Sequence, residues 1–595
     1  MNLHQYSTEE LILKRRMLRR KLMESSDLRE LRIAVLGGST TNELVDLWEL
    51  LLLAEGFRPV FHQTEYGRYY TDAVMSPEEI VAFKPDLVYI HTTVRNVETF
   101  APLQASEEDL ARHVAAELNR FRQIWDSIDA AIGCQVIQNN FELPLWAPLG
   151  NLDAVYPGGE NRFIAEMNSA FAKEAAARPK LVLQDLQGLS ARVGLNNWFD
   201  HDRWFSYKIA HTTDGHFAIA RSLTSLVRAL YGRSRKVLIL DLDNTLWGGV
   251  IGDDGVEKIK LGKETPTAEA YTAFQEYCLK QRNRGVLLAV CSKNDEETAK
   301  SGFDHPDSIL KLEHFSAFKA NWDPKHENIT QIAQELNLGL DSLVFIDDNP
   351  AERAIVAAQV PWVAVPDVGD QVSQFIDIIE RERYFETVSL GAEDLERARL
   401  YTENNQRATL QTKFANYGEY LDSLEMSAEI DEFRPVYLER ISQLTNKSNQ
   451  FNLTTKRYTL AEMESAMKDP DVIGLYARLA DRFGDNGLVS VVLGRIHRGE
   501  LNMELWLMSC RVLKRELEFA ILDALVERAA ARGVRQIIGQ YIPSKKNGMV
   551  AGHYEGLGFA VQSTREDGSS TWALEVRSYV PLSTHIRVAV VESVA

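Results

Sequence analysis

Short apolar runs alternate with longer amphipathic stretches along most of the chain. Runs such as Val237-Leu-Ile-Leu240 have the length of buried strands, and stretches long enough for helices separate them. This pattern extends from about Leu31 to residue 383 and is typical of parallel sheets covered by helices. From about 430 to 580, shorter strands such as Gly487-Leu-Val-Ser-Val-Val-Leu alternate with helices, which favours an α+β domain. The sequence therefore predicts a multidomain α/β protein.

The same pattern suggests where the domains begin and end. Residues 1–30 are expected to be helical, with Ser7 and Glu10 spaced as a capping box. Two α/β domains are expected over 31–232 and 233–383, and a helical connector over 384–430. The α+β domain is expected over 431–580 and a tail over 581–595.

Charge and composition exclude several classes of function. The 595 residues include 85 Asp+Glu and 66 Lys+Arg, a net charge of −19, which argues against nucleic-acid binding. No apolar run approaches the roughly 20 residues needed to span a membrane, and the N-terminal residues lack a signal-peptide pattern. The four cysteines have no C-x-x-C spacing, so neither a disulfide framework nor a zinc site is expected. We therefore expect a cytoplasmic protein with no nucleic-acid or membrane partner.

Acidic residues follow two of the apolar strands in the middle domain. Asp241-Leu-Asp243-Asn-Thr245 comes directly after one strand, and Asp347-Asp348 after another. Parallel strands end at one edge of a sheet, so these side chains are expected to gather there. Buried carboxylates without partners are costly, and a hard cation such as Mg²⁺ removes that cost and attracts phosphate.

Two further residues complete a set suited to phosphoryl transfer. Ser292 follows a third apolar strand, and Lys325 stands at an expected helix start after Pro324. A hydroxyl and an ammonium group can hold phosphate oxygens while an acid acts as the nucleophile. Lys319 is the alternative cation, although it lies farther from the helix start.

At these positions the sequence resembles the haloacid dehalogenase (HAD) phosphatase superfamily. The resemblance implies that Asp241 is the nucleophile that forms an aspartyl-phosphate, and that Asp243 is the general acid and then the base. It also implies a Mg²⁺ site at Asp241, Asp347, Asp348 and the backbone carbonyl of Asp243, with Thr245, Ser292 and Lys325 completing the catalytic set. Only 46 residues separate Thr245 from Ser292, and 21 separate Lys325 from Asp347. Neither gap has room for a separate cap domain, so we expect a site open to a bulky substrate.

Longer strings resemble the FkbH-like branch of this superfamily. They are LDLDNTLWGGVIGDDG, VCSKND, WDPKHENI and FIDDNPAER in the middle domain, with LTNKSNQFNLTT and LMSCRV in the last. The resemblance implies a role in polyketide or related biosynthesis. Such an enzyme would dephosphorylate the three-carbon 1,3-bisphosphoglycerate and load a glyceryl group onto the phosphopantetheine thiol of an acyl carrier protein.

Acyl transfer of this kind commonly passes through a covalent acyl-enzyme. Cys291 ends the strand before Ser292 and is one candidate nucleophile, with Cys510 as the second. The alternative for Cys291 is a buried, inert thiol.

The first domain resembles an SGNH/GDSL hydrolase in outline. The residues that carry this resemblance are a serine, two oxyanion donors and an Asp/His pair, namely Ser39, Gly67, Asn96, Asp214 and His216. Gly38 stands where the serine motif usually has Asp, and Asp214-Gly-His216 is one residue shorter than the usual spacing. The domain is therefore either an acyl-transfer catalyst or a docking domain without activity.

The last domain resembles a GNAT acyltransferase in the order of its elements. Lys514, Arg515 and Glu516 stand where such domains have a glycine-bearing pyrophosphate loop. Residues that could contact a carrier or its pantetheine arm are Cys510, Arg511, Lys514, Arg515, Asn547 and Tyr554.

Three functions remain open from the sequence. The first is glyceryl transfer to a carrier protein, and the second is simple phosphatase activity on another pathway phosphate. The third is a noncatalytic scaffold of three enzyme-like domains. The sequence does not fix the oligomeric state.

Overall fold

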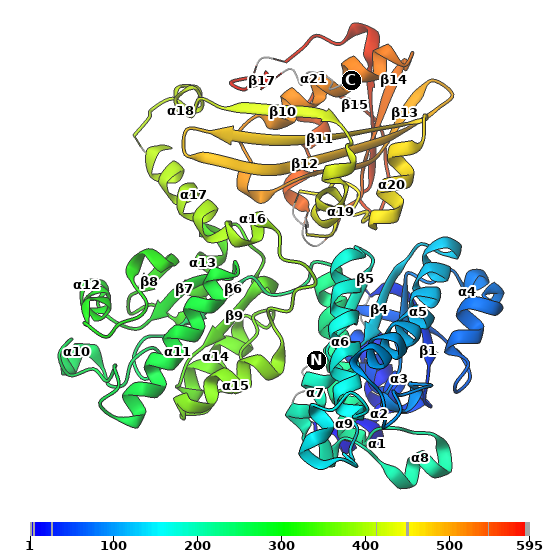
Figure 1. Ribbon diagram of the computed structural model, residues 1–595. Coiled ribbons are helices and arrows are strands. Elements are labelled where there is room, and N and C mark those ends of the chain that lie inside the picture. The colour runs from blue at the N-terminus through cyan, green and yellow to red at the C-terminus, as the bar shows by residue number, and fades with distance from the viewer. Residues whose placement is uncertain are drawn as a thin grey trace. The chain divides into compact units, whose positions relative to one another are not determined.

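The computed structural model describes residues 3, 6–24, 28–411, 413–447, 451–544, 547–582 and 584–589 (Figure 1). Within these ranges, it does not describe the side chains of residues 392, 393, 398, 402, 405, 408, 409, 447 and 510. The chain forms two compact units, Met1–Arg228 and Ala229–Ala595. In the described parts, no helix is both long and apolar enough to cross a bilayer.

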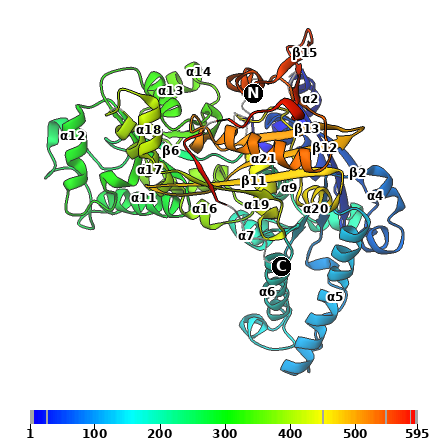
Figure 2. The same ribbon diagram turned by 90° about the horizontal axis from the view of Figure 1, so that it is seen from above.

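The first unit is built on a parallel sheet with the strand order β2-β1-β3-β4-β5. Its strands are β1 (Arg29–Gly37), β2 (Phe57–Gln63), β3 (Leu87–His91), β4 (Gln135–Asn139) and β5 (Leu181–Gln184). Its helices are α1 (Thr8–Leu13), α2 (Arg15–Met23), α3 (Asn42–Ala54), α4 (Glu78–Phe83), α5 (Glu107–Ala131), α6 (Glu160–Ala177), α7 (Leu186–Val193), α8 (His201–Tyr207) and α9 (Thr213–Leu230). The long helices α5 and α6 lie side by side in both views (Figures 1 and 2). The predicted capping box is present, because Ser7 and Glu10 bond each other's backbone N–H groups.

The second unit begins with another parallel sheet, in the order β8-β7-β6-β9. Its strands are β6 (Val237–Leu240), β7 (Leu287–Ser292), β8 (Phe315–Ala320) and β9 (Leu343–Ile346). Its helices are α10 (Ile251–Asp254), α11 (Pro266–Asn283), α12 (Glu296–Ser301), α13 (Lys325–Glu335), α14 (Pro350–Gln359) and α15 (Val372–Glu382). We refer to this part as the middle domain. Between Thr245 and Ser292 the chain forms α10, α11 and most of β7, and between Lys325 and Asp347 it forms most of α13 and β9. Neither gap, each of which the structure describes in full, contains a separate cap domain, as the sequence predicted.

Alternating residues of β6 show why helices cover both faces of this sheet. Leu238 and Leu240 pack in one core cluster with Phe274 of α11. Val237 and Ile239 pack in the other cluster, which contains residues of α13 and α14. Side chains of a strand point alternately to opposite faces, so a strand covered on both sides is apolar throughout.

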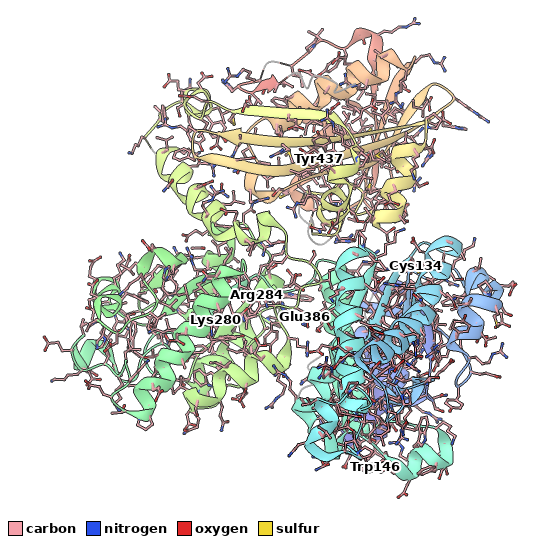
Figure 3. The ribbon with its side chains drawn as sticks, in the orientation of Figure 1. Cys134, Trp146, Lys280, Arg284, Glu386 and Tyr437 are labelled. Atoms are coloured by element: carbon pink, nitrogen blue, oxygen red, sulfur yellow. The ribbon has the colours of Figure 1, made fainter. Side chains whose placement is uncertain are left out.

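A helical connector, α16 (Ala392–Leu395), α17 (Arg397–Gln411) and α18 (Tyr417–Ser423), leads to the last domain. It follows a segment held to the middle domain by Arg284, which donates to the carbonyl of Phe385 beside Glu386 (Figure 3). Farther on, the connector is fixed to the last domain by Arg407, whose guanidinium donates to both carboxylate oxygens of Asp481 at 2.8 Å.

The last domain has a mixed sheet in the order β15-β16-β14-β13-β12-β11-β10-β17. Its strands are β10 (Ser427–Glu432), β11 (Val472–Asp481), β12 (Gly484–His497), β13 (Glu500–Met508), β14 (Gln536–Tyr541), β15 (Ala560–Thr564), β16 (Ser570–Glu575) and β17 (Arg587–Ala589). Its helices are α19 (Leu438–Lys447), α20 (Leu460–Lys468), α21 (Leu517–Ala531) and α22 (His553–Gly556). Residues 587–589, which the sequence placed in a tail, form β17 and pair with β10. The predicted fold class, a multidomain α/β protein, is confirmed.

Candidate active site

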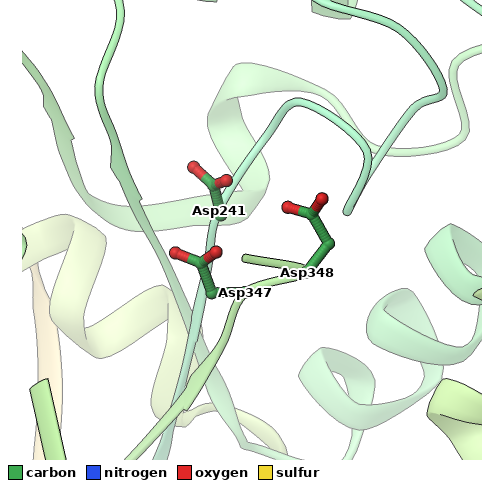
Figure 4. A group of neighbouring side chains, drawn as sticks. All are labelled: Asp241, Asp347 and Asp348. Carbon is green, nitrogen blue, oxygen red and sulfur yellow. The ribbon is translucent and has the colours of Figure 1, made fainter. Parts of the chain in front are cut away.

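The acids of the middle domain are brought together by two neighbouring strands. β6 and β9 are parallel, with Leu240 opposite Ile346, and the N–H of Asp241 donates to the carbonyl of Ile346 at 3.0 Å. Asp241 and Asp347 are therefore the first residues after two adjacent strands, and they lie beside each other. Asp241, Asp347 and Asp348 each have a carboxylate oxygen within 4.8 Å of the others. Figure 4 shows these three neighbouring side chains.

Lys325 lies against this carboxylate group. It is the first residue of α13, after Pro324 at the N-cap, and its side chain is 4% exposed. Its Nζ is 3.0 Å from Asp241 Oδ1 and 2.5 Å from Asp347 Oδ2. The alternative, Lys319, pairs instead with Glu335 at 3.2 Å. The structure therefore places Lys325, and not Lys319, beside the acids.

Burial sets the charge state of this group. Burial raises the pKa of Asp241 to about 6, and the charge of Asp347 adds to the rise while Lys325 opposes it. Burial also raises the pKa of Asp347 and of Asp348. The pKa of Lys325 is raised, because the two carboxylates outweigh the lowering effect of its burial.

These residues fit a hard divalent cation. Three ionised carboxylates facing one ammonium leave a net negative charge in a buried place, which is costly. Carboxylate oxygens are the donors that Mg²⁺ prefers, and this group offers them from two adjacent loops.

The carboxylate of Asp243 is hydrogen-bonded to the segment that follows it in the loop after β6. We call residues 247–255 the flap. Asp243 Oδ1 accepts hydrogen bonds from Trp247 Nε1 at 2.9 Å and from the N–H of Ile251 at 3.0 Å. Its Oδ2 accepts a bond from Asn294 Nδ2 at 2.9 Å. The carboxylate of Asp243 is thus fixed by the flap and by the loop after β7.

The two predicted hydroxyl residues are buried at the same sheet edge. Thr245 Oγ1 accepts the backbone N–H of Asp348 at 3.3 Å, which joins the loops after β6 and β9. Ser292 Oγ accepts a bond from Asn294 Nδ2 at 3.2 Å, and a hydrogen bond from Ser292 lowers the pKa of Asp241. Sequence reasoning missed Asn294, although it lies two residues after Ser292 within the string VCSKND.

Cys291 belongs to the core and not to the site, which corrects its candidacy as an acyl-carrying nucleophile. Its side chain is 0% exposed and packs with Ile239 and Ala289 on the face of the sheet covered by α13 and α14. Burial raises the pKa of the Cys291 thiol well above its usual range. A thiol must ionise to act as a nucleophile, and burial opposes that ionisation here.

The first unit assembles part of the predicted serine site. Ser39 follows β1 and is 1% exposed, and its hydroxyl has no hydrogen-bond partner among the described residues. Asn96 Nδ2 donates to the carbonyl of Gly38 at 2.9 Å. Gly67, however, uses its N–H to bond the carbonyl of Gly37 at 3.0 Å and is not an oxyanion donor in this arrangement.

The histidine of this site, His216, contacts a different acidic residue from the one that the sequence predicted. His216 Nδ1 lies 2.9 Å from Oε1 of Glu43, at the start of α3, whereas Asp214 is exposed. Although burial opposes the change, His216 and Arg203 lower the pKa of Glu43 to about 2. The pairing of His216 with Asp214 is therefore corrected to His216 with Glu43, a residue that the sequence analysis did not single out.

Two more buried histidines, His91 and His211, lie next to His216. The rings of His91 and His211 are 5.4 Å apart, and those of His211 and His216 are 5.6 Å apart. Burial lowers the pKa of His91 to about 3 and raises that of nearby Glu142 to about 7. Within the described chain, each of these residues has a buried polar atom without a partner. The first unit therefore contains a buried polar cluster at the carboxyl edge of its sheet.

In the last domain, the chain itself fills the gap between β13 and β14. These parallel strands pair only from Glu500 to Asn502 and then separate. In the gap, Leu453 N–H donates to Trp506 O at 3.1 Å, Met508 N–H to Phe451 O at 3.1 Å, and Ile542 N–H to Leu453 O at 2.9 Å. Residues 451–454, from one of the strings that carry the FkbH-like resemblance, thus act as an inserted strand.

The predicted carrier contacts of this domain have mainly structural partners. Arg515 is buried and bonds Asp481 at 2.9 Å, and burial lowers its pKa to about 10. Tyr417 of the connector donates to the carbonyl of Lys514 at 2.5 Å. Asn547 donates to the carbonyls of Asn452 and Ile542 at 3.0 and 2.9 Å.

The remaining carrier-contact candidates of this domain are Arg511, Tyr554 and Cys510. Arg511 Nε donates to the hydroxyl of Ser509 at 3.2 Å. Tyr554 is buried beside Trp506, and its hydroxyl has no partner in the part of the chain that the structure describes. The side chain of Cys510 lies outside the described residues.

Comparison with solved structures places the chain in a family. The N-terminal part of the protein BF1531 from Bacteroides fragilis, described as containing a phosphatase domain complexed with Mg, is 30% identical to this chain. The match covers 64% of this chain and 100% of that one, with a TM-score of 0.59. The chain belongs to the same family as this phosphatase-domain protein. Its middle domain is accordingly a HAD-like phosphatase domain.

Other solved structures match a smaller part. The acetyltransferase of the GNAT family from Streptococcus pneumoniae is 17% identical and covers 25% of this chain and 99% of its own, with a TM-score of 0.22. The ribosomal-protein-S18-alanine N-acetyltransferase from Escherichia coli is 14% identical and covers 25% and 94%, with a TM-score of 0.20. At these scores the likeness carries no argument about activity. No family model and no curated protein matches the chain.

Proposed function

We propose that the chain is a Mg²⁺-dependent HAD-type enzyme of the FkbH-like branch. Its substrate would be 1,3-bisphosphoglycerate or a similar acyl phosphate, and its product a glyceryl thioester on an acyl carrier protein. The observation that carries the proposal is the buried contact of Lys325 with Asp241 and Asp347. This contact supports the proposal because Asp241 as nucleophile, Asp347 as metal-binding carboxylate and Lys325 as cation would then all reach one phosphate group.

The residues divide the first step between them. The Asp241 carboxylate would attack the phosphorus of the C3 phosphate ester, so that a bond from Asp241 to phosphorus forms as the bond from phosphorus to the ester oxygen breaks. The acyl phosphate at C1 would remain for the second step. Asp243 would give that oxygen its proton and later take one from the water that hydrolyses the aspartyl-phosphate. Lys325 and the Ser292 hydroxyl would hold the phosphate oxygens. Mg²⁺, when bound by Asp241, Asp347, Asp348 and the carbonyl of Asp243, would neutralise the phosphate charge.

The second step would use the carrier's own thiol. Its thiolate would attack the acyl carbon, forming a C–S bond while the C–O bond to the acyl phosphate breaks and phosphate leaves. An enzyme thiol is not required for this step, and Cys291 does not supply one because it is buried in the core.

Intact mass spectrometry tests this proposal. The protein, Mg²⁺ and enzymatically generated 1,3-bisphosphoglycerate would be incubated with phosphopantetheinylated carrier proteins. A glyceryl adduct on a carrier that disappears with Asp241→Asn supports glyceryl transfer. A carrier without its phosphopantetheine arm is the matched control and should gain no mass.

Simple phosphatase activity on another pathway phosphate is the second candidate. The observation that favours it is the group of three carboxylates with Lys325, because hydrolysis of a phosphate by this group needs no acyl acceptor. Release of phosphate without a mass change on any carrier would support this candidate. A protein that releases no phosphate from any substrate would favour the noncatalytic scaffold.

We also propose an acyl-transfer site in the first unit, favoured by the contact between His216 and Glu43. Ser39 would be the nucleophile and His216 its base, with Glu43 orienting the imidazole as the acid does in a catalytic triad. Both the Ser39 hydroxyl and His216 Nε2 are buried and have no partner among the described residues.

A fluorophosphonate probe tests this second site directly. Labelling of Ser39 should disappear with Ser39→Ala and fall strongly with Glu43→Gln. Asp214→Asn is the matched control and should label normally, because Asp214 is exposed. Absence of labelling in the wild-type protein would indicate a docking domain.

A further inference from the structure

Asn294 lies between two parts of the candidate site that the sequence motifs keep separate. It follows β7, and its side chain is buried. Its amide nitrogen is 2.9 Å from Asp243 Oδ2 and 3.2 Å from Ser292 Oγ. An amide group carries two hydrogens, so one NH₂ group can serve both acceptors.

These bonds connect the flap with the loop after β7. On one side, Asp243 is bonded to Trp247 and Ile251 of the flap. On the other side, Asn294 donates to the hydroxyl of Ser292, which is buried at the same sheet edge as Asp241. Asn294 thus links the general acid and the flap to the hydroxyl residue that follows β7.

The hydrogen bonds of Asp243 show how Asn294 restrains its carboxylate. Oδ1 of this carboxylate already accepts two bonds from the flap, which fix one end of the group. The bond from Asn294 to Oδ2 fixes the other end and so sets the rotation of the carboxylate plane. A proton can be delivered efficiently only from a group held in the correct geometry.

We propose that Asn294 is a positioning residue that orients Asp243 for transfer of a proton to the leaving group. This inference rests on the phosphatase activity proposed above and assigns a role to a residue to which the resemblance gives none. Asn294 itself forms and breaks no bond to the substrate. Its contribution is the orientation of Asp243.

The dependence on the leaving group distinguishes this role from a structural one. An alkyl phosphate needs a proton on its leaving oxygen, whereas p-nitrophenyl phosphate releases a stable anion without one. Loss of Asn294 should therefore affect the two substrates differently. A general loss of folding or of metal binding would affect both to the same degree.

The experiment compares kcat/KM for glycerol 2-phosphate and p-nitrophenyl phosphate in the full-length protein with Mg²⁺. For Asn294→Ala we expect a loss of roughly 10–100-fold with the alkyl substrate, the range found when supporting residues are removed. The loss with p-nitrophenyl phosphate should be about fivefold or less, with KM for both substrates nearly unchanged. Asn283→Ala, at an exposed asparagine of α11, is the matched control and should keep both activities.

A second variant protects the test against misfolding. Asn294→Ser keeps a hydrogen-bond donor on a shorter side chain, so it should retain part of the selectivity for the alkyl substrate if Asn294→Ala fails to fold. Equal losses with both substrates, or no loss with either, would overturn the role of Asn294 alone. A wild-type protein without activity on any phosphate would instead overturn the proposed function.

Discussion

The ammonium group of Lys325 lies 3.0 Å from Oδ1 of Asp241, and both side chains are almost completely removed from solvent. In such surroundings the charges of an ammonium group and a carboxylate are stabilised mainly by each other, because water contributes little to the stability of either charge. The contact therefore affects both the stability of the middle domain and the reactivity of Asp241.

Replacing Lys325 by Met should remove activity and destabilise the metal-free protein. Asp241, Asp347 and Asp348 would then face one another without a cation, and loss of one partner of a buried ion pair costs about 3–5 kcal/mol. Urea unfolding without Mg²⁺ measures this change. Lys319→Met, which breaks the more exposed pair with Glu335, should cost about 1 kcal/mol or less. Equal losses for the two variants would contradict this interpretation.

Stabilisation by Mg²⁺ should increase with pH. The pKa of Asp241 is about 6 in the folded chain and 3.8 in its ordinary state, so the folded protein binds the extra proton more tightly. The contribution of this group to stability therefore falls as pH rises from about 4 to 6 and stays low above that. Mg²⁺ competes with the proton, so the rise in Tm on adding Mg²⁺ should be small at pH 5 and larger at pH 8. Thermal unfolding at both pH values measures it, and Asp241→Asn should reduce the difference.

Cys291→Ala should retain phosphatase activity. The thiol is buried in the core, where burial raises its pKa, so it neither attacks nor binds the substrate. We expect a loss of about 1 kcal/mol in the free energy of unfolding, typical of a core substitution. In the native protein, iodoacetamide should leave Cys291 unmodified. Loss of activity in a variant that keeps its fold would contradict this prediction.

Gly38→Ala should destabilise the first unit through contact with Asn96. A Cβ atom at residue 38 would lie 2.4 Å from Oδ1 of Asn96 and 2.6 Å from its Cγ. Such overpacking costs roughly 1–3 kcal/mol. The double variant with Asn96→Ala should recover part of that loss, which a double-mutant cycle of unfolding free energies measures. Additive effects would show that the clash is relieved elsewhere.

Arg407→Ala should weaken the attachment of the connector to the last domain. Arg407 is 2% exposed, and its loss would leave Asp481 paired with Arg515 alone. A cost of about 3–5 kcal/mol is expected from breaking this buried pair. Arg399→Ala is the matched control, because Arg399 is 51% exposed and should contribute little. Limited proteolysis of the connector would give an independent measure.

The middle domain was the part most readily predicted from sequence. Val237–Leu240 is apolar throughout, as a strand covered on both faces must be, and the acids follow it directly. Register between parallel strands then brings Asp241 beside Asp347 without further information. Lys325 could be placed because Pro324 marks the start of its helix.

Other features have no local signal. Glu43 and His216 are separated by 173 positions, and Glu43 alone is an ordinary acid in the first turn of a helix. The filling of the gap between β13 and β14 by residues 451–454 depends on the point at which those strands separate, which their hydrophobicity does not reveal. Asn294 is similar, because a single asparagine after a strand usually serves a turn.

The ladder between β6 and β9 also limits how this chain can change in length. The separation of Asp241 and Asp347 is set by two hydrogen-bonded backbones, which lie about 4.8 Å apart in any sheet. Insertion or deletion of one residue within either strand would turn its terminal acid to the opposite face. Changes in length at this sheet are therefore tolerable only in the loops beyond the acids or before the strands, whereas substitutions in the covering helices leave the spacing intact.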